Sequence, residues 1–185
     1  MEFYLKYQGV LKSNASPQDK HALRKHFHRQ IKCLFDMDEN LHKRENWSLE
    51  APASEDEKTM YCIVQKEAFH FAPLISSKLF LLAEIDITLL WSDLPGQIIG
   101  NGDIDNKLKT LLDALSCPVH SNQLTGLVPA EGEKPFYCLL EDDKLIQNIN
   151  VRTHTLFDCN DKKEQFVLLH VKSKCTKLVW GNMGL

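Results

Sequence analysis

The clearest pattern in the chain is the run LFLLAEIDITLLW over residues 79–91. With a period of two, Glu84, Asp86 and Thr88 fall on one side and apolar residues on the other. This alternation predicts a long, central strand with one partly polar face. Further strands are expected at residues 3–11, 61–71, 136–140, 145–157 and 165–180.

Two segments have the apolar spacing of helices. Pro17 suits a first helical turn and opens a long segment that runs to about residue 46. Four leucines between residues 106 and 116 recur at helical spacing and predict a shorter helix there. Residues 47–59 are a polar surface connection. Residues 117–135 hold three prolines and form a connection longer than most in compact domains, which is typical of a functional loop.

These elements predict an α/β chain of the α+β kind. We expect a small mixed sheet packed with helices, a long N-terminal helix, and an extended loop before the last acidic segment. The length of 185 residues, with 43% hydrophobic and 25% charged residues, fits one globular domain over residues 1–185. No uncharged run is apolar enough to span a membrane, and the first residues lack the apolar core of a signal peptide. We therefore expect a cytoplasmic protein without a membrane partner.

The six cysteines are scattered without any C-x-x-C pair, at positions 33, 62, 117, 138, 159 and 175. A domain of this size does not need disulfides for stability, so we expect reduced and mostly buried thiols. No ligand spacing supports a zinc site.

The net charge of −3 argues against indiscriminate attraction of nucleic acid, so any polyanion must meet a local patch. Residues 20–32, KHALRKHFHRQIK, offer one. Helical spacing puts Lys20, Arg24, His28 and Lys32 in one row, with His21, Lys25 and Arg29 beside it. This face is either a solvated side of an amphipathic helix or a nucleic-acid contact made by Arg24, Lys25, Arg29 and Lys32.

Two carboxylates one residue apart, Asp103 and Asp105, reach a helix start in the segment GDIDNKLKTLLDAL of residues 102–115. Acids at this place either cap free N–H groups or converge on a cation. Lys109 lies four residues from both Asp105 and Asp113. It either forms two ion pairs along the helix or holds a positive charge beside a phosphate.

A second acidic element, Glu141, Asp142 and Asp143, follows an apolar run. Alone it is typical of an exposed turn. Together with the first pair it supplies the carboxylate oxygens that Mg²⁺ or Mn²⁺ prefers.

The order D-I-D-N-x-x-K-x-x-x-D-A-L, followed by an apolar-E-D-D-x-x-I segment, resembles the RusA-like Holliday junction resolvases, a family of crossover junction endodeoxyribonucleases. The resemblance covers roughly residues 100 to 150. It implies a small α/β fold, a homodimer, and the use of Mg²⁺ or Mn²⁺ to cut branched DNA at four-way junctions. Matched residue by residue, it implies metal ligands at Asp103, Asp105, Asp142 and Asp143, and a catalytic set of Asp103, Asp105, Asp143 and Lys109, with Asn106 as the family's following Asn.

Three features depart from the family's pattern. The basic run before the D-x-D is here IIGNG, the proline-rich N-terminal signature is reduced to SNASP, and the 117–135 loop is longer. Phosphate contacts must therefore come from elsewhere.

Two alternatives stay open beside junction resolution. One is a non-catalytic module that binds branched nucleic acid, and the other is a metal-dependent nuclease for flap DNA or RNA. If the acids form one metal site, the carboxylates of Asp103, Asp105 and Asp143 should lie about 4 to 6 Å apart.

Overall fold

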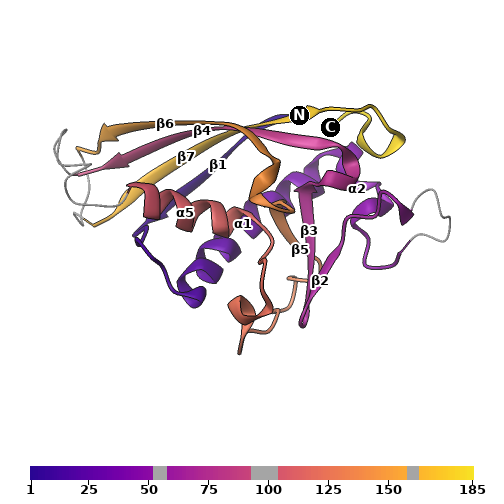
Figure 1. The fold of residues 1–185 in the computed structure, drawn as a ribbon, viewed down its shortest axis with the longest axis horizontal. Helices are drawn as coiled ribbons and strands as arrows, with labels where there is room; N and C mark the ends of the chain where they lie inside the picture. The colour runs from indigo at the N-terminus through magenta and orange to yellow at the C-terminus, as the bar shows by residue number, and fades with distance from the viewer. Residues whose placement is uncertain (52–57, 93–103, 158–162) are drawn as a thin grey trace.

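The computed structural model describes residues 1–51, 58–92, 104–157 and 163–185. Its fold is α+β, with two small mixed sheets and helices packed between and beside them (Figure 1). The helices are α1 (Pro17–Met37), α2 (Glu39–His42) and α5 (Ile104–Leu115). The strands are β1 (Glu2–Gly9), β2 (Val64–Lys66), β3 (Phe69–Ile75), β4 (Leu81–Trp91), β5 (Phe136–Leu140), β6 (Ile146–Thr155) and β7 (Gln165–Cys175). Short 3₁₀ turns are η1 (Glu45–Trp47), η2 (Ser77–Leu79), η3 (Ser121–Leu124), η4 (Asp143–Leu145) and η5 (Trp180–Asn182).

The larger sheet has the strand order β1-β7-β4-β6. β7 runs antiparallel to both β1 and β4, whereas β6 runs parallel to β4. The central place expected for residues 79–91 is confirmed, because β4 pairs on both edges. Its burial alternates strictly, with Ile85 and Ile87 inside and Asp86 outside, so the predicted polar face is also confirmed.

The smaller sheet has the order β2-β3-β5. The single strand expected at residues 61–71 is wrong, because the chain turns at Glu67, whose φ is 50°, and forms the antiparallel hairpin of β2 and β3. β5 then joins β3 in parallel. The strand thus continues to Ile75, beyond the expected end.

Helix α1 begins at Pro17, as expected. The Ser16 hydroxyl accepts a hydrogen bond from the backbone N–H of Asp19, and the Asp19 carboxylate accepts one from the N–H of Ser16. This capping box fixes the first turn. The helix ends at Met37 rather than near residue 46, because Asp38 takes an extended conformation and caps α2 with its carboxylate.

Helix α1 is buried on two faces. One face places Phe27, Ile31 and Phe35 in the main apolar core with the inner side of the larger sheet. The other face packs against β5 and β3: His28 Nδ1 accepts a hydrogen bond from the N–H of Tyr137 at 2.8 Å, and His21 lies edge-on to Phe69. Figure 1 shows α1 beneath the larger sheet and next to the smaller one.

The described cysteines 33, 62, 117, 138 and 175 are free thiols. Cys62, Cys117 and Cys138 are buried, whereas Cys33 and Cys175 are exposed. Cys159 lies outside the described residues. Across the described ranges, none of the helices combines the length and the apolar character needed to cross a bilayer.

Candidate functional site

Helix α5 carries the first of the predicted acidic elements. Asp105 stands exposed in its first turn, and Leu111, Ala114 and Leu115 bury the opposite face. The Lys107 ammonium lies 4.5 Å from the centre of the Trp91 ring, which ties the start of α5 to the end of β4. Asp103, the other acid of the D-x-D, lies outside the described residues.

Lys109 is exposed on α5 and forms no ion pair within the described part of the chain. Asp113, one of its two expected partners, instead pairs with Lys20 of α1 at 2.6 Å. Of the two interpretations of Lys109, the one with two ion pairs along α5 is therefore wrong, and the one with a positive charge beside a phosphate stays a prediction. The Lys109 ammonium stays available to a ligand at the surface of α5.

The acidic turn after β5 is held in place by Glu141. One oxygen of its carboxylate accepts hydrogen bonds from the Ser76 hydroxyl at 2.7 Å, the Ser77 N–H at 2.8 Å and the Ser77 hydroxyl at 2.9 Å. Through these hydrogen bonds, Glu141 fastens the acidic turn to the start of η2. Asp142 and Asp143 remain as the acids of the turn.

Asp142 and Asp143 interact directly. The Asp142 carboxylate accepts a hydrogen bond from the N–H of Lys144 at 2.9 Å, and this contact is the main cause that lowers the pKa of Asp142. The pKa of Asp143 is raised, first by burial and then by its hydrogen bond to Asp142 and the charges of Asp142 and Asp113. A cation placed beside Asp142 and Asp143 would favour the charged form of both carboxylates and relieve the rise in the pKa of Asp143.

The acidic turn lies next to the C-terminal end of α5 (Figure 1). The N–H of Cys117 donates to the carbonyl of Leu140 at 2.9 Å, so the chain leaving α5 is hydrogen-bonded to the end of β5. Asp113 is therefore the α5 carboxylate whose charge acts on Asp143. Asp105 lies eight residues earlier on α5, or about 12 Å along the helix axis.

The structure thus brings Asp113, Asp142 and Asp143 into one acidic neighbourhood. Asp113 is the last acid of the first motif, so the sequence contained a sign of its importance. The sequence interpretation assigned it only an ion pair with Lys109, and its place beside the acidic turn was missed. Among the described residues no group of three His, Cys, Asp or Glu side chains is arranged to hold a metal ion. The predicted convergence of Asp103, Asp105 and Asp143 stays a prediction, since Asp103 is outside those residues.

Arg24 does not lie on an exposed basic row, and its expected contact with nucleic acid is wrong. Its side chain is 2% exposed. The guanidinium donates to the carbonyl of Asp113 at 2.8 Å and to that of Ser116 at 3.3 Å. Burial lowers its pKa. Arg24 therefore caps the last turn of α5 from inside the protein.

The other three basic candidates share one face of α1, at helical positions i, i+4 and i+7. Lys25 forms an ion pair with Glu133 at 3.0 Å, Arg29 is exposed, and Lys32 is half-buried. Their contact with nucleic acid stays a prediction.

Comparisons with family models, with curated proteins and with solved structures find no match for this chain. The sites therefore rest on the residues and their geometry.

Proposed function

We propose that this protein is a Mg²⁺-dependent, structure-selective endonuclease that resolves four-way DNA junctions by phosphodiester hydrolysis, in the manner of the RusA-like resolvases. The observation that carries the proposal is the pairing of two acidic motifs, in residues 102–115 and 141–146. Support comes from the fold, in which the C-terminal end of the first motif's helix, with Asp113, lies next to the acidic turn of the second motif.

The acids fit the chemistry of a hard divalent cation. Asp103, Asp105 and Asp143, and Asp142 next to Asp143, offer carboxylate oxygens, which Mg²⁺ and Mn²⁺ prefer over nitrogen or sulfur. When bound, such a cation lowers the pKa of a coordinated water and stabilises charge on a phosphoryl oxygen. Without a cation the same carboxylates would repel the phosphodiester.

Lys109 supplies the second positive charge in this proposal. Its ammonium is exposed and makes no ion pair within the described residues, so it is available to a phosphate oxygen. A fixed cation there stabilises the negative charge that develops as the phosphodiester is cleaved. A homodimer, as the resemblance implies, would present two such sites to two strands of one junction.

A non-catalytic module for branched nucleic acid is the second candidate. It is favoured by Lys25, Arg29 and Lys32, which share a face of α1 without involving any predicted metal ligand. A nuclease that acts on flap DNA or RNA uses the same acids as the main proposal.

One cleavage assay separates these functions. The purified chain is incubated with labelled four-way junction, flap, duplex and RNA, with Mg²⁺ or with EDTA. We expect junction cleavage in Mg²⁺, none in EDTA, and a rate roughly 100-fold lower in Asp105→Asn and Asp143→Asn. Asp36→Asn, an exposed acid at the end of α1, is the control and should cut at the wild-type rate.

The other outcomes are equally informative. Junction binding without cleavage favours the module, and cleavage of flap or RNA alone favours the third function. Cleavage that persists in EDTA, or in both acid variants, contradicts the proposal.

A further inference from the structure

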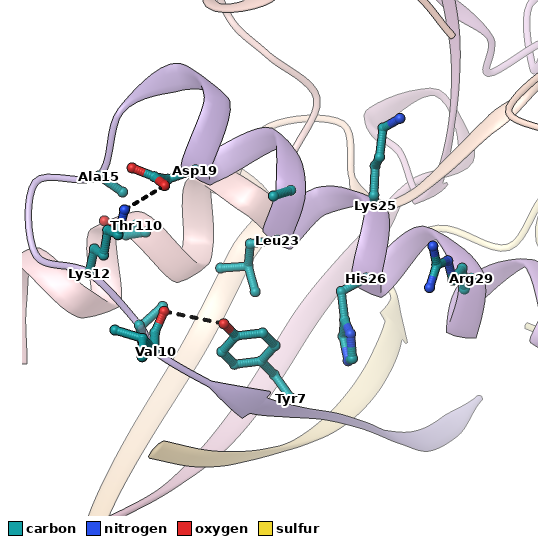
Figure 2. Close-up of a pocket in the computed structure, with 12 residues that line it drawn as sticks. Tyr7, Val10, Lys12, Ala15, Asp19, Leu23, Lys25, His26, Arg29 and Thr110 are labelled. Atoms are coloured by element: carbon teal, nitrogen blue, oxygen red, sulfur yellow. Dashed lines mark hydrogen bonds and ion pairs between the residues drawn. The ribbon is translucent and has the colours of Figure 1, made fainter. Parts of the chain in front are cut away.

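A pocket of about 430 Å³ lies between the end of β1 with the connection that follows it, residues 19–29 of α1, and the middle of α5 (Figure 2). Its volume is within the range of small-molecule sites. Thr110 contributes from α5, while Val10, Leu11 and Leu23 give it an apolar interior. Charged groups stand at its two ends: the ion pair of Lys12 and Asp19 at one, and Arg29 at the other.

Helical spacing explains which residues of α1 line this pocket. Asp19, Ala22, His26 and Arg29 recur every three or four residues and form one stripe along the helix. Ala22 leaves space in the middle of the stripe, between the polar residues. The stripe therefore offers a small apolar surface followed by a guanidinium.

The pocket carries an uncompensated positive charge. Lys12 pairs with Asp19 at 2.8 Å, and Lys25 pairs with Glu133 at 3.0 Å. Arg29 is exposed and has neither an ion pair nor a hydrogen bond to any described residue. The whole chain has a net charge of −3 and does not attract anions in general. The positive charge of Arg29 is local, and it favours an anion at this pocket. The planar guanidinium can donate two parallel hydrogen bonds to two oxygens of one phosphate group.

The wall opposite α1 is rigid. The Gln30 amide donates to the carbonyl of Lys6 at 2.8 Å and accepts from its N–H at 3.0 Å, and a ring nitrogen of His26 also lies 2.9 Å from that carbonyl. These bonds fasten the free edge of β1 to α1. The Tyr7 ring meets His26 edge-on, and its hydroxyl donates to the carbonyl of Val10 at 3.2 Å. A wall fixed in this way loses little freedom when a ligand binds.

We propose that this pocket binds a nucleotide, with the phosphate at Arg29 and the base and sugar against Val10, Ala22 and Leu23. The described residues that line it include neither the acids of the turn nor those of α5. The inference therefore does not rest on the proposed nuclease function. The nucleotide is either a free mononucleotide or the phosphorylated end of a nucleic-acid strand, and both present the same chemistry.

Calorimetric titration of the full chain with AMP, adenosine and inorganic phosphate tests the site. We expect saturable binding of AMP that is tighter than that of adenosine or phosphate alone. Arg29→Ala should weaken AMP binding about 10-fold or more, since it removes a charge-assisted hydrogen bond. Arg152→Ala is the matched control, because Arg152 is also exposed but lies in β6, outside this pocket, and its effect should stay below about 2-fold.

A second pair of variants tests the apolar part of the pocket. Ala22→Phe should fill the space and abolish AMP binding, whereas Gln18→Phe, on the same helix outside the pocket, should not. Both variants are checked by thermal unfolding, so that a misfolded chain is recognised. Absence of saturable AMP binding, equal affinity for AMP and adenosine, or equal losses in Arg29→Ala and Arg152→Ala would overturn the proposal.

Competition identifies the source of the nucleotide. An oligodeoxyadenylate with a 5′-phosphate that displaces AMP, while the 5′-hydroxyl form does not, assigns the pocket to a strand end. AMP binding without such displacement assigns it to a free nucleotide. Either result supports the site. A variant that loses DNA cleavage but keeps AMP binding, or one that loses AMP binding but keeps DNA cleavage, separates this inference from the nuclease proposal.

Discussion

Arg24 joins α1 to the last carbonyls of α5 from inside the protein. Replacing it with Met leaves the carbonyls of Asp113 and Ser116 without these partners. We expect Arg24→Met to lower the free energy of unfolding by about 2 to 4 kcal/mol. The exposed Arg29 is the matched control, and Arg29→Ala should change stability by less than about 0.5 kcal/mol. Urea unfolding measures both, and equal stability of the two variants would contradict the structural role of Arg24.

Replacing Lys109 should affect the cleavage rate but not the free energy of unfolding. It is exposed and makes no ion pair within the described residues, so Lys109→Ala should alter the free energy of unfolding by less than about 0.5 kcal/mol. If its ammonium stabilises charge at the scissile phosphate, the same change should lower single-turnover cleavage by roughly 100-fold. Lys43→Ala, directly after α2, is a surface control that should keep the wild-type rate. A Lys109→Ala protein that cuts at that rate removes Lys109 from the mechanism.

The partners of individual side chains were the part of the site that the sequence could not predict. Spacing along α5 correctly placed Lys109 and Asp113 on neighbouring turns, but Asp113 pairs with Lys20 of another helix. Likewise, Glu141 stood in an acidic run, and only tertiary structure shows that its carboxylate accepts hydrogen bonds from Ser76 and Ser77 at the start of η2. Local spacing limits which partners are possible, and long-range packing selects among them.

At the scale of elements, α1 shows why the basic row was misplaced. Its apolar spacing correctly predicted a helix, and the structure places Phe27 and Ile31 on the buried face of that helix. The second buried face carries polar residues, and a polar face on a helix is usually solvated. It is buried here because β5 provides a hydrogen bond for His28 and α5 provides carbonyls for Arg24. The parallel pairing of β3 with β5 could not be predicted from the sequence either, since these strands are far apart in the chain.

The buried polar face of α1 predicts a loss of stability in acid. Burial, with the positive charges of Arg24 and Lys25, lowers the pKa of His21 to about 4 against the opposing charge of Glu133. Burial also lowers the pKa of His28. The unfolded chain takes up protons near pH 6.5, where the folded chain keeps His21 neutral. The free energy of unfolding should therefore fall as the pH decreases from about 6.5 to about 4, by up to about 3 kcal/mol for His21.

Urea unfolding between pH 7 and pH 4 measures this effect. The His21→Phe variant should lose less stability over that interval than the wild type, because a ring that cannot be protonated then faces Phe69 and Phe136. His42→Gln, in the short helix α2, should keep the wild-type slope. Identical slopes for His21→Phe and the wild type would show that other groups control acid stability.

The whole molecule has a net charge of −3, so the contact with DNA that we propose must be local. The outer side of the larger sheet combines both signs of charge: Glu84 pairs with Lys174 at 3.0 Å, and Glu2 pairs with Lys172 at 3.6 Å. Such mutual neutralisation gives little attraction for a phosphate backbone. The face of α1 with Arg29 and Lys32 is less neutralised, and it is where we expect the polyanion.

The salt dependence of junction binding tests that expectation, measured in EDTA to prevent cleavage. Each phosphate contact contributes about one unit to the slope of log K against log salt concentration. Arg29→Ala and Lys32→Ala should each reduce the slope by about 1, because each removes one contact. Lys25→Ala should have a smaller effect, since Glu133 already neutralises Lys25. Arg152→Ala, on the sheet, should leave the slope unchanged, and a reduction equal to that of Arg29→Ala would move the DNA contact away from α1.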